Sequence, residues 1–261
     1  MLGAVFTDKP IIQPLTPLLW LGNLHARKPR YEEVTRLFAA LSTGIQELEE
    51  FYSQVDFKLV SEARLFPYIT TFTEKGTGCE VQFTYEKSTD PIPGDNKAAF
   101  IANTQDGRKI VIKFKESYNA TGHSLLAAEG LAPPLLTSDR STCSDFTMVV
   151  TGYTGGMQTL SYLYSQGYNT PPDSLPSISG ALKILHANGL VFGYLGPQNI
   201  LVSRYLAQFV DFDWCGKVGE GEYPAGVNNV GIKWPEGVVP GGHLQFEHDN
   251  EMFRRLSEGR Y

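Results

Sequence analysis

Charged residues are scarce in this sequence. Asp, Glu, Lys and Arg make up 19% of its 261 residues, below the roughly 25% that is typical of soluble domains. The formal net charge is −6, whereas a broad nucleic-acid surface usually needs a basic excess. We therefore expect no nucleic-acid partner, although a local basic pocket for phosphate groups remains compatible with the composition.

Cysteines and long apolar runs are also scarce. Three isolated cysteines show no metal-ligand spacing, and neither C-x-x-C nor H-E-x-x-H occurs. A sparse, odd count favours reduced thiols, so we expect a cytoplasmic or nuclear protein that is not secreted. Asp8, Pro10 and Pro14 interrupt the apolar N-terminal segment, which lacks a charged start. We expect neither a signal peptide nor a membrane span, and no membrane partner.

Enough apolar residues are present to build a core. Hydrophobic residues make up 42% of the chain and aromatic residues 12%. This length suits one large domain or two lobes. Sixteen prolines and 26 glycines predict many loops.

Residues 31–55 predict an amphipathic helix, which Gly44 could interrupt. Apolar residues recur there at helical spacing, with glutamates between them. An ordinary packing helix is the common explanation of such a pattern, and a helix that docks a protein partner is the alternative. The apolar positions are Val34, Leu37, Phe38, Leu41, Ile45, Leu48 and Phe51.

The middle of the chain reads mainly as strands. Residues 66–86 predict two strands around a Gly-rich turn, and residues 88–96 predict a loop. Residues 98–114 predict a hairpin around Asp106-Gly107, and its second strand includes Lys113 in an apolar context. A short helix ended by Gly130 follows, and then a strand over 146–153.

Helices dominate the remainder. We expect helices over 157–167, over 174–189 with an end at Asn188-Gly189, and near 247–258. Strands followed by helices predict an α+β protein of two lobes. The junction falls in the Gly-containing segment 151–156, and a cleft between lobes is a usual ligand site.

Residues 189–213 contain the most informative pattern. Two apolar runs flank a Gly/Pro loop that ends at Asn199, and Asp211-Phe212-Asp213 follows. This layout brings an amide oxygen and a carboxylate to the same end of a small hairpin. Both are hard oxygen donors that suit Mg²⁺ held against phosphates. Asp213 is either a second acidic ligand or a cap for the next turn.

The order of these parts resembles the protein-kinase-like superfamily over roughly residues 66–255. A strand lysine, a helix, a strand leading into a hinge, a long helix ending in LHANGLV, the loop to Asn199 and then VDFD follow one another as in that superfamily. The segments GLAPPLL, LHANGLVFG and EHDNEMF resemble its compact fungal kinase-like family most closely. The sequence departs at the catalytic Asp, whose position is occupied by Tyr194.

The resemblance implies a two-lobed protein-kinase-like fold with a β-rich N-lobe and a reduced helical C-lobe. We expect an N-terminal helical extension over 1–60, the N-lobe over 61–150 and the C-lobe over 151–261. Carried over by motif, Lys113 would pair with the phosphates of ATP, and Asn199 and Asp211 would hold Mg²⁺. The backbone around Val150 and Gly152 would face the adenine.

Other parts of the kinase pattern are weak. No G-x-G-x-x-G precedes Lys113, and only Gly107 lies in the hairpin turn. The helix glutamate that usually pairs with the lysine is either missing or supplied by Glu116. His248 and Asp249 resemble a pair that anchors the catalytic loop.

Tyr194 decides the expected mechanism. A phenol with a pKa of about 10 is a poor base at neutral pH, and losing a positioned base typically costs ~10²–10⁴-fold in rate. We therefore expect a pseudokinase-like scaffold that binds ATP with Mg²⁺ but is catalytically impaired. The alternative is an active ATP-dependent phosphotransferase in which Asp213 or a substrate group replaces the base. A third hypothesis is a kinase-like scaffold that binds no nucleotide.

Overall fold

The computed structural model describes residues 3–6, 11–14, 28–54, 69–86, 99–143, 146–225, 227 and 233–259. By its internal contacts the chain divides into two compact units, Met1–Tyr68 and Ile69–Tyr261. The expected loop over 88–96 lies outside the described residues. None of the helices in the described ranges is long and apolar enough to cross a membrane.

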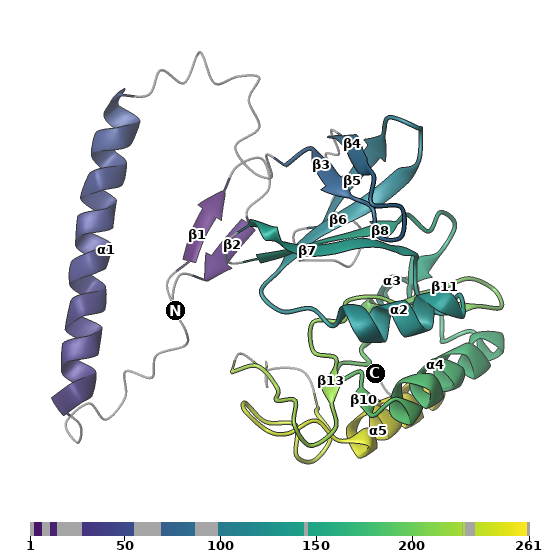
Figure 1. Ribbon diagram of the computed structural model, residues 1–261. Coiled ribbons are helices and arrows are strands. Elements are labelled where there is room, and N and C mark those ends of the chain that lie inside the picture. The colour runs from purple at the N-terminus through teal and green to yellow at the C-terminus, as the bar shows by residue number, and fades with distance from the viewer. Residues whose placement is uncertain are drawn as a thin grey trace. The chain divides into compact units, whose positions relative to one another are not determined.

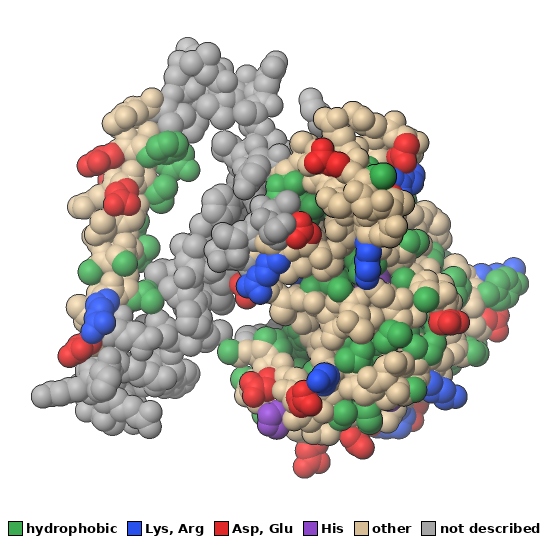
Figure 2. Space-filling model, in the orientation of Figure 1, with side chains coloured by type: hydrophobic (Ala, Val, Ile, Leu, Met, Phe, Trp, Pro, Cys, Tyr) green, Lys and Arg blue, Asp and Glu red, His purple; other side chains and the backbone are tan. Residues whose placement is uncertain are grey.

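The first unit contains a hairpin and one long helix. Strands β1 (Gly3–Phe6) and β2 (Ile11–Pro14) pair in antiparallel fashion. Helix α1 (Lys28–Gln54) confirms the predicted helix and runs through Gly44 without interruption. Several of its large apolar side chains are exposed, and Figure 2 shows hydrophobic side chains on its surface. The exposed ones are Phe38, Ile45, Leu48, Phe51 and Tyr52.

The second unit begins with an antiparallel sheet of six strands in the order β3-β4-β5-β6-β8-β7. Alternation decides its buried face: Ile110 and Ile112 of β6 are fully buried, while Val111 between them is half-buried. The predicted hairpin around Asp106-Gly107 joins β5 to β6, and Gly107 has a positive φ of 84°. The strands are β3 (Thr71–Thr73), β4 (Glu80–Tyr85), β5 (Ala99–Thr104), β6 (Lys109–Lys115), β7 (Leu135–Cys143) and β8 (Phe146–Gly152).

Helices form the rest of this unit, and Figure 1 shows α2 between the sheet and the pair α4 and α5. Helix α2 is followed by Gly130 at a φ of 71°, and α4 by Gly189 at 69°, so both glycines end helices as predicted. The helices are α2 (Ala120–Ala128), α3 (Leu160–Ser165), α4 (Leu175–Ala187) and α5 (Phe246–Ser257), with 3₁₀ turns η2 (Pro172–Ser174) and η3 (Pro197–Asn199).

Short strands complete the helical part. Strands β9 (Gln158–Thr159), β11 (Ile200–Val202) and β12 (Ala207–Phe209) form one small sheet. Strand β10 (Leu190–Val191) pairs with β13 (Gly216–Lys217) in another. The hairpin that ends near Asp211 is therefore β11–β12, and the apolar run at 190–191 belongs to a different sheet.

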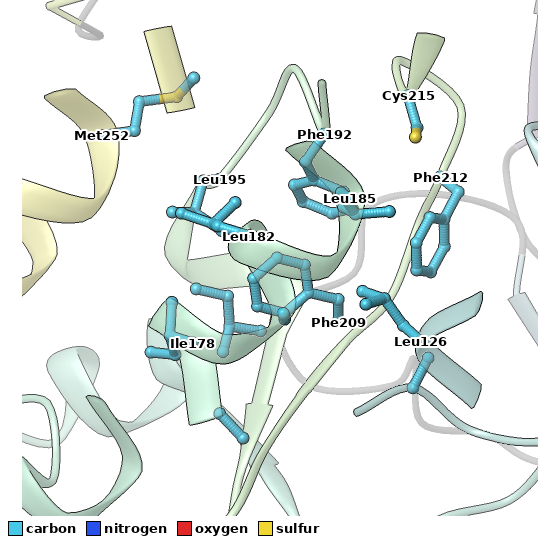
Figure 3. Packing of buried hydrophobic residues seen from close by; sticks show 14 of the residues in the cluster. Leu126, Ile178, Leu182, Leu185, Phe192, Leu195, Phe209, Phe212, Cys215 and Met252 are labelled. Atoms are coloured by element: carbon cyan, nitrogen blue, oxygen red, sulfur yellow. The ribbon is translucent and has the colours of Figure 1, made fainter. Parts of the chain in front are cut away.

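The main apolar core joins these helices and strands. Phe192, Phe209 and Phe212 are fully buried, with Leu126 of α2 and Met252 of α5 in the same cluster (Figure 3). Burying a large side chain of this kind stabilises the fold by about 1.5–3 kcal/mol. The cluster fixes the loops on either side of Phe192 and Phe212, and these loops form the site described next.

Candidate functional site

A cavity of about 350 Å³ lies between the sheet and the helical part of the second unit, within the size range of small-molecule sites. Val111 and Val149 line it from the sheet, and Leu201 and Val210 line it from the β11–β12 hairpin. Lys113 and Asp211 also line it. The cavity therefore has apolar walls and one charged region.

Lys113 reaches this charged region from β6. Its Nζ lies 3.8 Å from Asp211 Oδ1, and the two side chains are 16% and 3% exposed. Strand β6 is flanked by β5 and β8, so the lysine stem is held by a central strand. The structure thus brings together two residues that are far apart in the sequence.

Asp211 has an unusual backbone conformation. Its φ of 71° is the only positive value for a non-glycine among the described residues, and such strain concentrates at functional sites. Strand pairing of Ile200 with Phe209, and the bond from Val210 N to Asn199 O at 2.9 Å, fix this end of the hairpin. Asn199 and Asp211 therefore flank the same end of β11–β12, as the sequence indicated.

Lys115 is a charged residue of the site that the sequence reasoning missed. Its Nζ lies 2.5 Å from Asp211 Oδ1 and 2.8 Å from Asp213 Oδ2, and its side chain is only 9% exposed. Lys113 and Lys115 are two residues apart, so a strand places both on one face. Asp211 and Asp213 are also two residues apart. This matching spacing is the feature of the sequence that could have indicated a role for Lys115.

Phe212, between the two acids, is anchored in the core. The His123 ring of α2 stacks on it with centroids 4.7 Å apart and planes 6° apart. Tyr118 and Phe192 contact its ring edge-on. The aromatic packing holds both neighbouring carboxylates in place.

His123 is neutral at physiological pH, because burial lowers its pKa from 6.5 to about 4. Its Nε2 lies 2.8 Å from the Pro133 carbonyl, which can only accept, so Nε2 holds the proton. Its Nδ1 then accepts from the Tyr118 hydroxyl at 2.5 Å. Burial, with the charge of Asp211 second, raises the pKa of Tyr118 well above its ordinary value.

Tyr194 belongs to an aromatic cluster. Its ring stacks on Trp214 with centroids 4.7 Å apart, and Trp234 lies 4.9 Å away. A Cβ on Gly196 would lie 2.7 Å from Tyr194 Cε2, so the ring needs glycine at that position. Asn199 Nδ2 donates to the Tyr194 carbonyl at 3.0 Å.

Helix α5 anchors the backbone just before Tyr194. The fully buried Asp249 accepts hydrogen bonds from Phe192 N at 2.8 Å and Gly193 N at 3.0 Å, and it also pairs with His186 Nε2 at 3.0 Å. This geometry confirms the anchoring that was expected of Asp249. Its neighbour His248 contacts the Tyr223 hydroxyl at 3.0 Å.

Of the two residues predicted to face the adenine, one lies in the core and the other lines the cavity. Val150 is fully buried and does not line the cavity, whereas Gly152 does. Val149 and Thr151 line it because they point to the other face of β8. Two hinge amides are already used, since Gly152 N donates to the Pro134 carbonyl and Tyr153 N to the Lys109 carbonyl.

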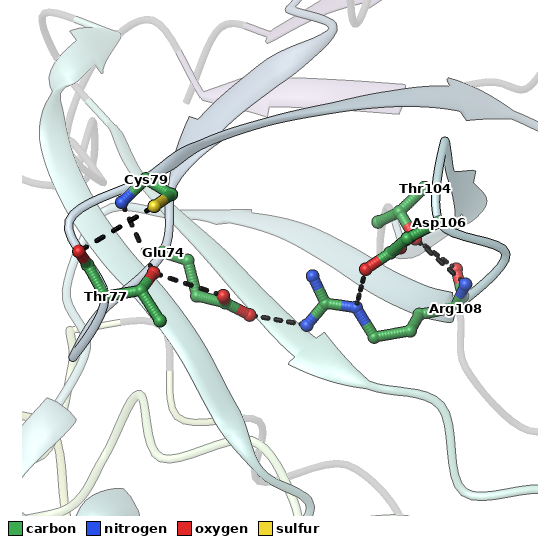
Figure 4. A network of polar contacts seen from close by, with 6 residues as sticks. All are labelled: Glu74, Thr77, Cys79, Thr104, Asp106 and Arg108. Carbon is green, nitrogen blue, oxygen red and sulfur yellow. Dashed lines mark hydrogen bonds and ion pairs between the residues drawn. The ribbon is translucent and has the colours of Figure 1, made fainter.

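The turn around Gly107 is not near the charged region. It joins β5 and β6 at the Asn103–Lys109 end, whereas Lys113 pairs with Ala99 at the other end. Arg108 there binds Asp106 at 2.7 Å and Glu74 at 2.5 Å (Figure 4). The turn is thus tied to the neighbouring hairpin rather than to the cavity.

The expected helix glutamate has no counterpart in α2, whose sequence contains no acid. Glu116 is exposed. Within the described residues, Asp211 is a carboxylate that lies within ion-pair distance of Lys113.

No family model matches the sequence, and no curated protein matches it. Among solved structures, the chain is similar to the kinase PK-1 of Cydia pomonella granulovirus, with a TM-score of 0.52 and 14% identity over 68% of this chain and 67% of that chain. A structure of the Rad53 kinase domain and SCD2 in complex with AMPPNP matches with a TM-score of 0.39 and 15% identity, over 51% of each chain. This chain thus spans about half of the latter structure.

The likeness to PK-1 shows the fold. The chain has an α+β, two-lobed protein-kinase-like fold, with a β-rich N-lobe, a helical C-lobe and an N-terminal helical extension. The closer resemblance to the compact fungal family and the lobe boundary at residue 150 remain predictions.

Proposed function

We propose that this protein binds an adenine nucleotide such as ATP in the cavity between its lobes and transfers phosphate inefficiently or not at all. The observation that supports this proposal is the meeting of Lys113 and Asp211 at one end of an apolar cavity. Val111 and Leu201, from opposite sides, suit the faces of a flat ring. An ammonium at the polar end suits the phosphates.

The aromatic surroundings of Tyr194 support the impaired step. A phenol is a poor base at neutral pH, and this ring is stacked on Trp214. The kinase pattern often has a lysine or arginine at the position of Gly196, which neutralises the transferring phosphoryl group. That cation is missing here, and a Cβ at this position would lie 2.7 Å from the Tyr194 ring. Phosphoryl transfer depends on positioned charge, so both changes act against turnover.

Magnesium fits this donor set less well than the sequence predicted. Asn199 and Asp211 offer oxygen donors, but the Lys115 ammonium already lies 2.5 Å from Asp211 Oδ1. In the part of the chain that the structure describes, no three His, Cys, Asp or Glu side chains form a candidate metal site. We therefore propose nucleotide binding without assigning Mg²⁺ a role.

A protein partner and a cellular location were also predicted from the sequence, and we keep both as proposals. The exposed apolar side chains of α1 support a protein partner that docks on this helix, which is the expectation for residues 31–55. A cytoplasmic or nuclear location rests on the cysteine usage alone.

Thermal unfolding tests the nucleotide proposal. A ligand at ~100 times its dissociation constant adds about 2.7 kcal/mol to the stability of the folded state, so ATP should raise the Tm by several degrees. Lys113→Ala should abolish the shift, whereas Lys217→Ala, an exposed lysine paired with Glu220, should keep it. If ATP leaves the Tm of the wild-type protein unchanged, the chain is a nucleotide-free scaffold.

Turnover separates an impaired protein from the active alternative, in which Asp213 replaces the base. We expect ATP hydrolysis by the wild-type protein at the rate of a buffer control. Steady hydrolysis that Tyr194→Asp changes only modestly would instead favour the rearranged phosphotransferase.

A further inference from the structure

A half-buried lysine and a buried lysine share two carboxylates beside the cavity, which Lys113 and Asp211 line. Lys113 and Lys115 come from one face of β6, and both lie within ion-pair distance of Asp211. Lys115 also binds Asp213 at 2.8 Å. Among the described residues, these two lysines balance the charge of the two aspartates.

The loop that contains both acids cannot easily move away from Lys115. Asn119 N donates to the Phe212 carbonyl at 3.1 Å, and Ser117 Oγ donates to the Asp213 carbonyl at 3.0 Å. The Phe212 side chain between them is fully buried. The contacts of Lys115 with both acids are therefore fixed by the packing and hydrogen bonds of this loop.

A divalent cation would meet unfavourable conditions in this cluster. Mg²⁺ binds through carboxylates and keeps an octahedral shell of oxygens at 2.0–2.1 Å. The Asp211 oxygen is contacted by an ammonium at 2.5 Å, and a buried cation next to another is strongly disfavoured at low dielectric. Metal could enter only by displacing Lys115 from its buried position.

We propose that the Lys115 ammonium takes the place of a divalent cation between Asp211 and Asp213, so that an anionic ligand binds this site without a divalent metal. The tethered ammonium holds the two carboxylates as a bound metal would, and Lys113 faces the cavity as the cation for phosphate. The ligand class, a nucleotide phosphate, rests on the proposed function, whereas the exclusion of metal rests on the cluster alone.

Mn²⁺ titration followed by electron paramagnetic resonance tests the exclusion of metal. The wild-type protein should leave Mn²⁺ free. Lys115→Met keeps the apolar stem and removes the charge, so this variant should bind Mn²⁺ and gain several degrees in Tm when Mn²⁺ is added. Lys109→Met, on the same strand but paired with Glu86, should behave like the wild type.

Two results would overturn the proposal. One is Mn²⁺ binding by the wild-type protein that Asp211→Asn abolishes, which can be measured even where Lys115→Met does not fold. The other is a folded Lys115→Met protein that gains no Mn²⁺ binding.

Nucleotide binding gives a separate measurement. The Tm shift with ATP should be the same in EDTA and in excess Mg²⁺. A shift that requires Mg²⁺ would overturn this inference while the proposed function stands. The absence of a shift in both buffers would overturn the proposed function, and the Mn²⁺ titration would still decide the role of Lys115.

Discussion

Tyr194 and Gly196 depend on each other. The Tyr194 ring occupies the space that a Cβ at position 196 would need, with a separation of only 2.7 Å. Trp214 stacks on the other side of this ring, so the ring cannot retreat freely. An aromatic residue at 194 therefore requires glycine at 196, which links the two departures from the kinase pattern.

Gly196→Ala should destabilise the protein by about 1–3 kcal/mol, the usual cost of overpacking. In a Tyr194→Ala background the remaining close neighbour of the added methyl is the end of the Gln198 side chain, at 2.8 Å. This flexible side chain can turn away, so most of the cost should vanish. Urea unfolding of the four proteins measures the coupling as a double-mutant cycle. Gly180→Ala is the control, because nothing lies within 4 Å of its Cβ and alanine favours a helix. Strictly additive effects would contradict the steric link.

His123 makes the stability of this fold depend on pH. Burial lowers its pKa from 6.5 to about 4, so between these values the unfolded chain binds a proton that the folded chain does not. Stability therefore falls as the pH is lowered through this window. Protonation would also place a cation in a stack with Phe212 that is now neutral.

We expect roughly 2 kcal/mol of the free energy of unfolding to be lost through His123 between pH 7 and pH 5. His123→Leu should be less stable at pH 7 but should lose this part of the pH dependence. Urea unfolding at both pH values gives the comparison. His248, whose pKa is also lowered by burial, is present in both proteins and cancels. Equal pH slopes would show that His123 is not the group responsible.

Among the elements, α5 acts mainly through one carboxylate. Asp249 accepts hydrogen bonds from two backbone N–H groups of the segment that leads to Tyr194, and its side chain is fully buried. It thereby ties the last described helix to the loop between β10 and η3. Helix α5 thus holds the backbone just before Tyr194, and Trp214 holds the Tyr194 ring.

Asp249→Asn should cost about 2–3 kcal/mol of stability, because a charged acceptor is replaced by a group with one oxygen. Glu247→Gln is the matched control on the same helix, exposed and expected to change stability by less than ~0.5 kcal/mol. Urea unfolding of both variants tests the anchor. Similar stabilities of the two variants would mean that the loop is held by other contacts.

Elements with strong local signals could be predicted from the sequence. The β5–β6 hairpin follows from Asp106-Gly107 between alternating residues, and the end of α4 follows from Asn188-Gly189. The sequence pattern predicts a hairpin between the apolar run of β10 and the run after Asn199, and this prediction is wrong. Strand β10 pairs instead with Gly216–Lys217, a segment that has no strand pattern of its own. Short strands paired across the chain leave little trace in local sequence.

At the scale of the whole molecule, the site joins segments that local patterns cannot connect. Lys113 and Asp211 were placed together only through the resemblance to kinases, which also assigned Lys115 no role. The Lys115 contacts, the stack of His123 on Phe212 and the enclosure of Tyr194 by Trp214 and Trp234 are long-range packing. Such contacts follow from the folded geometry and not from spacing along the chain.

The exposed face of α1 gives the last prediction, since it concerns whether this helix serves the fold or a partner. Phe51 is 60% exposed and Phe209 is fully buried. Phe51→Glu should change the free energy of unfolding by less than ~0.5 kcal/mol, whereas Phe209→Ala should cost about 3–5 kcal/mol. Urea unfolding of the full chain compares them. A large loss in Phe51→Glu would mean that the apolar face is already buried within the molecule, and it would remove the main support for a partner that docks on α1.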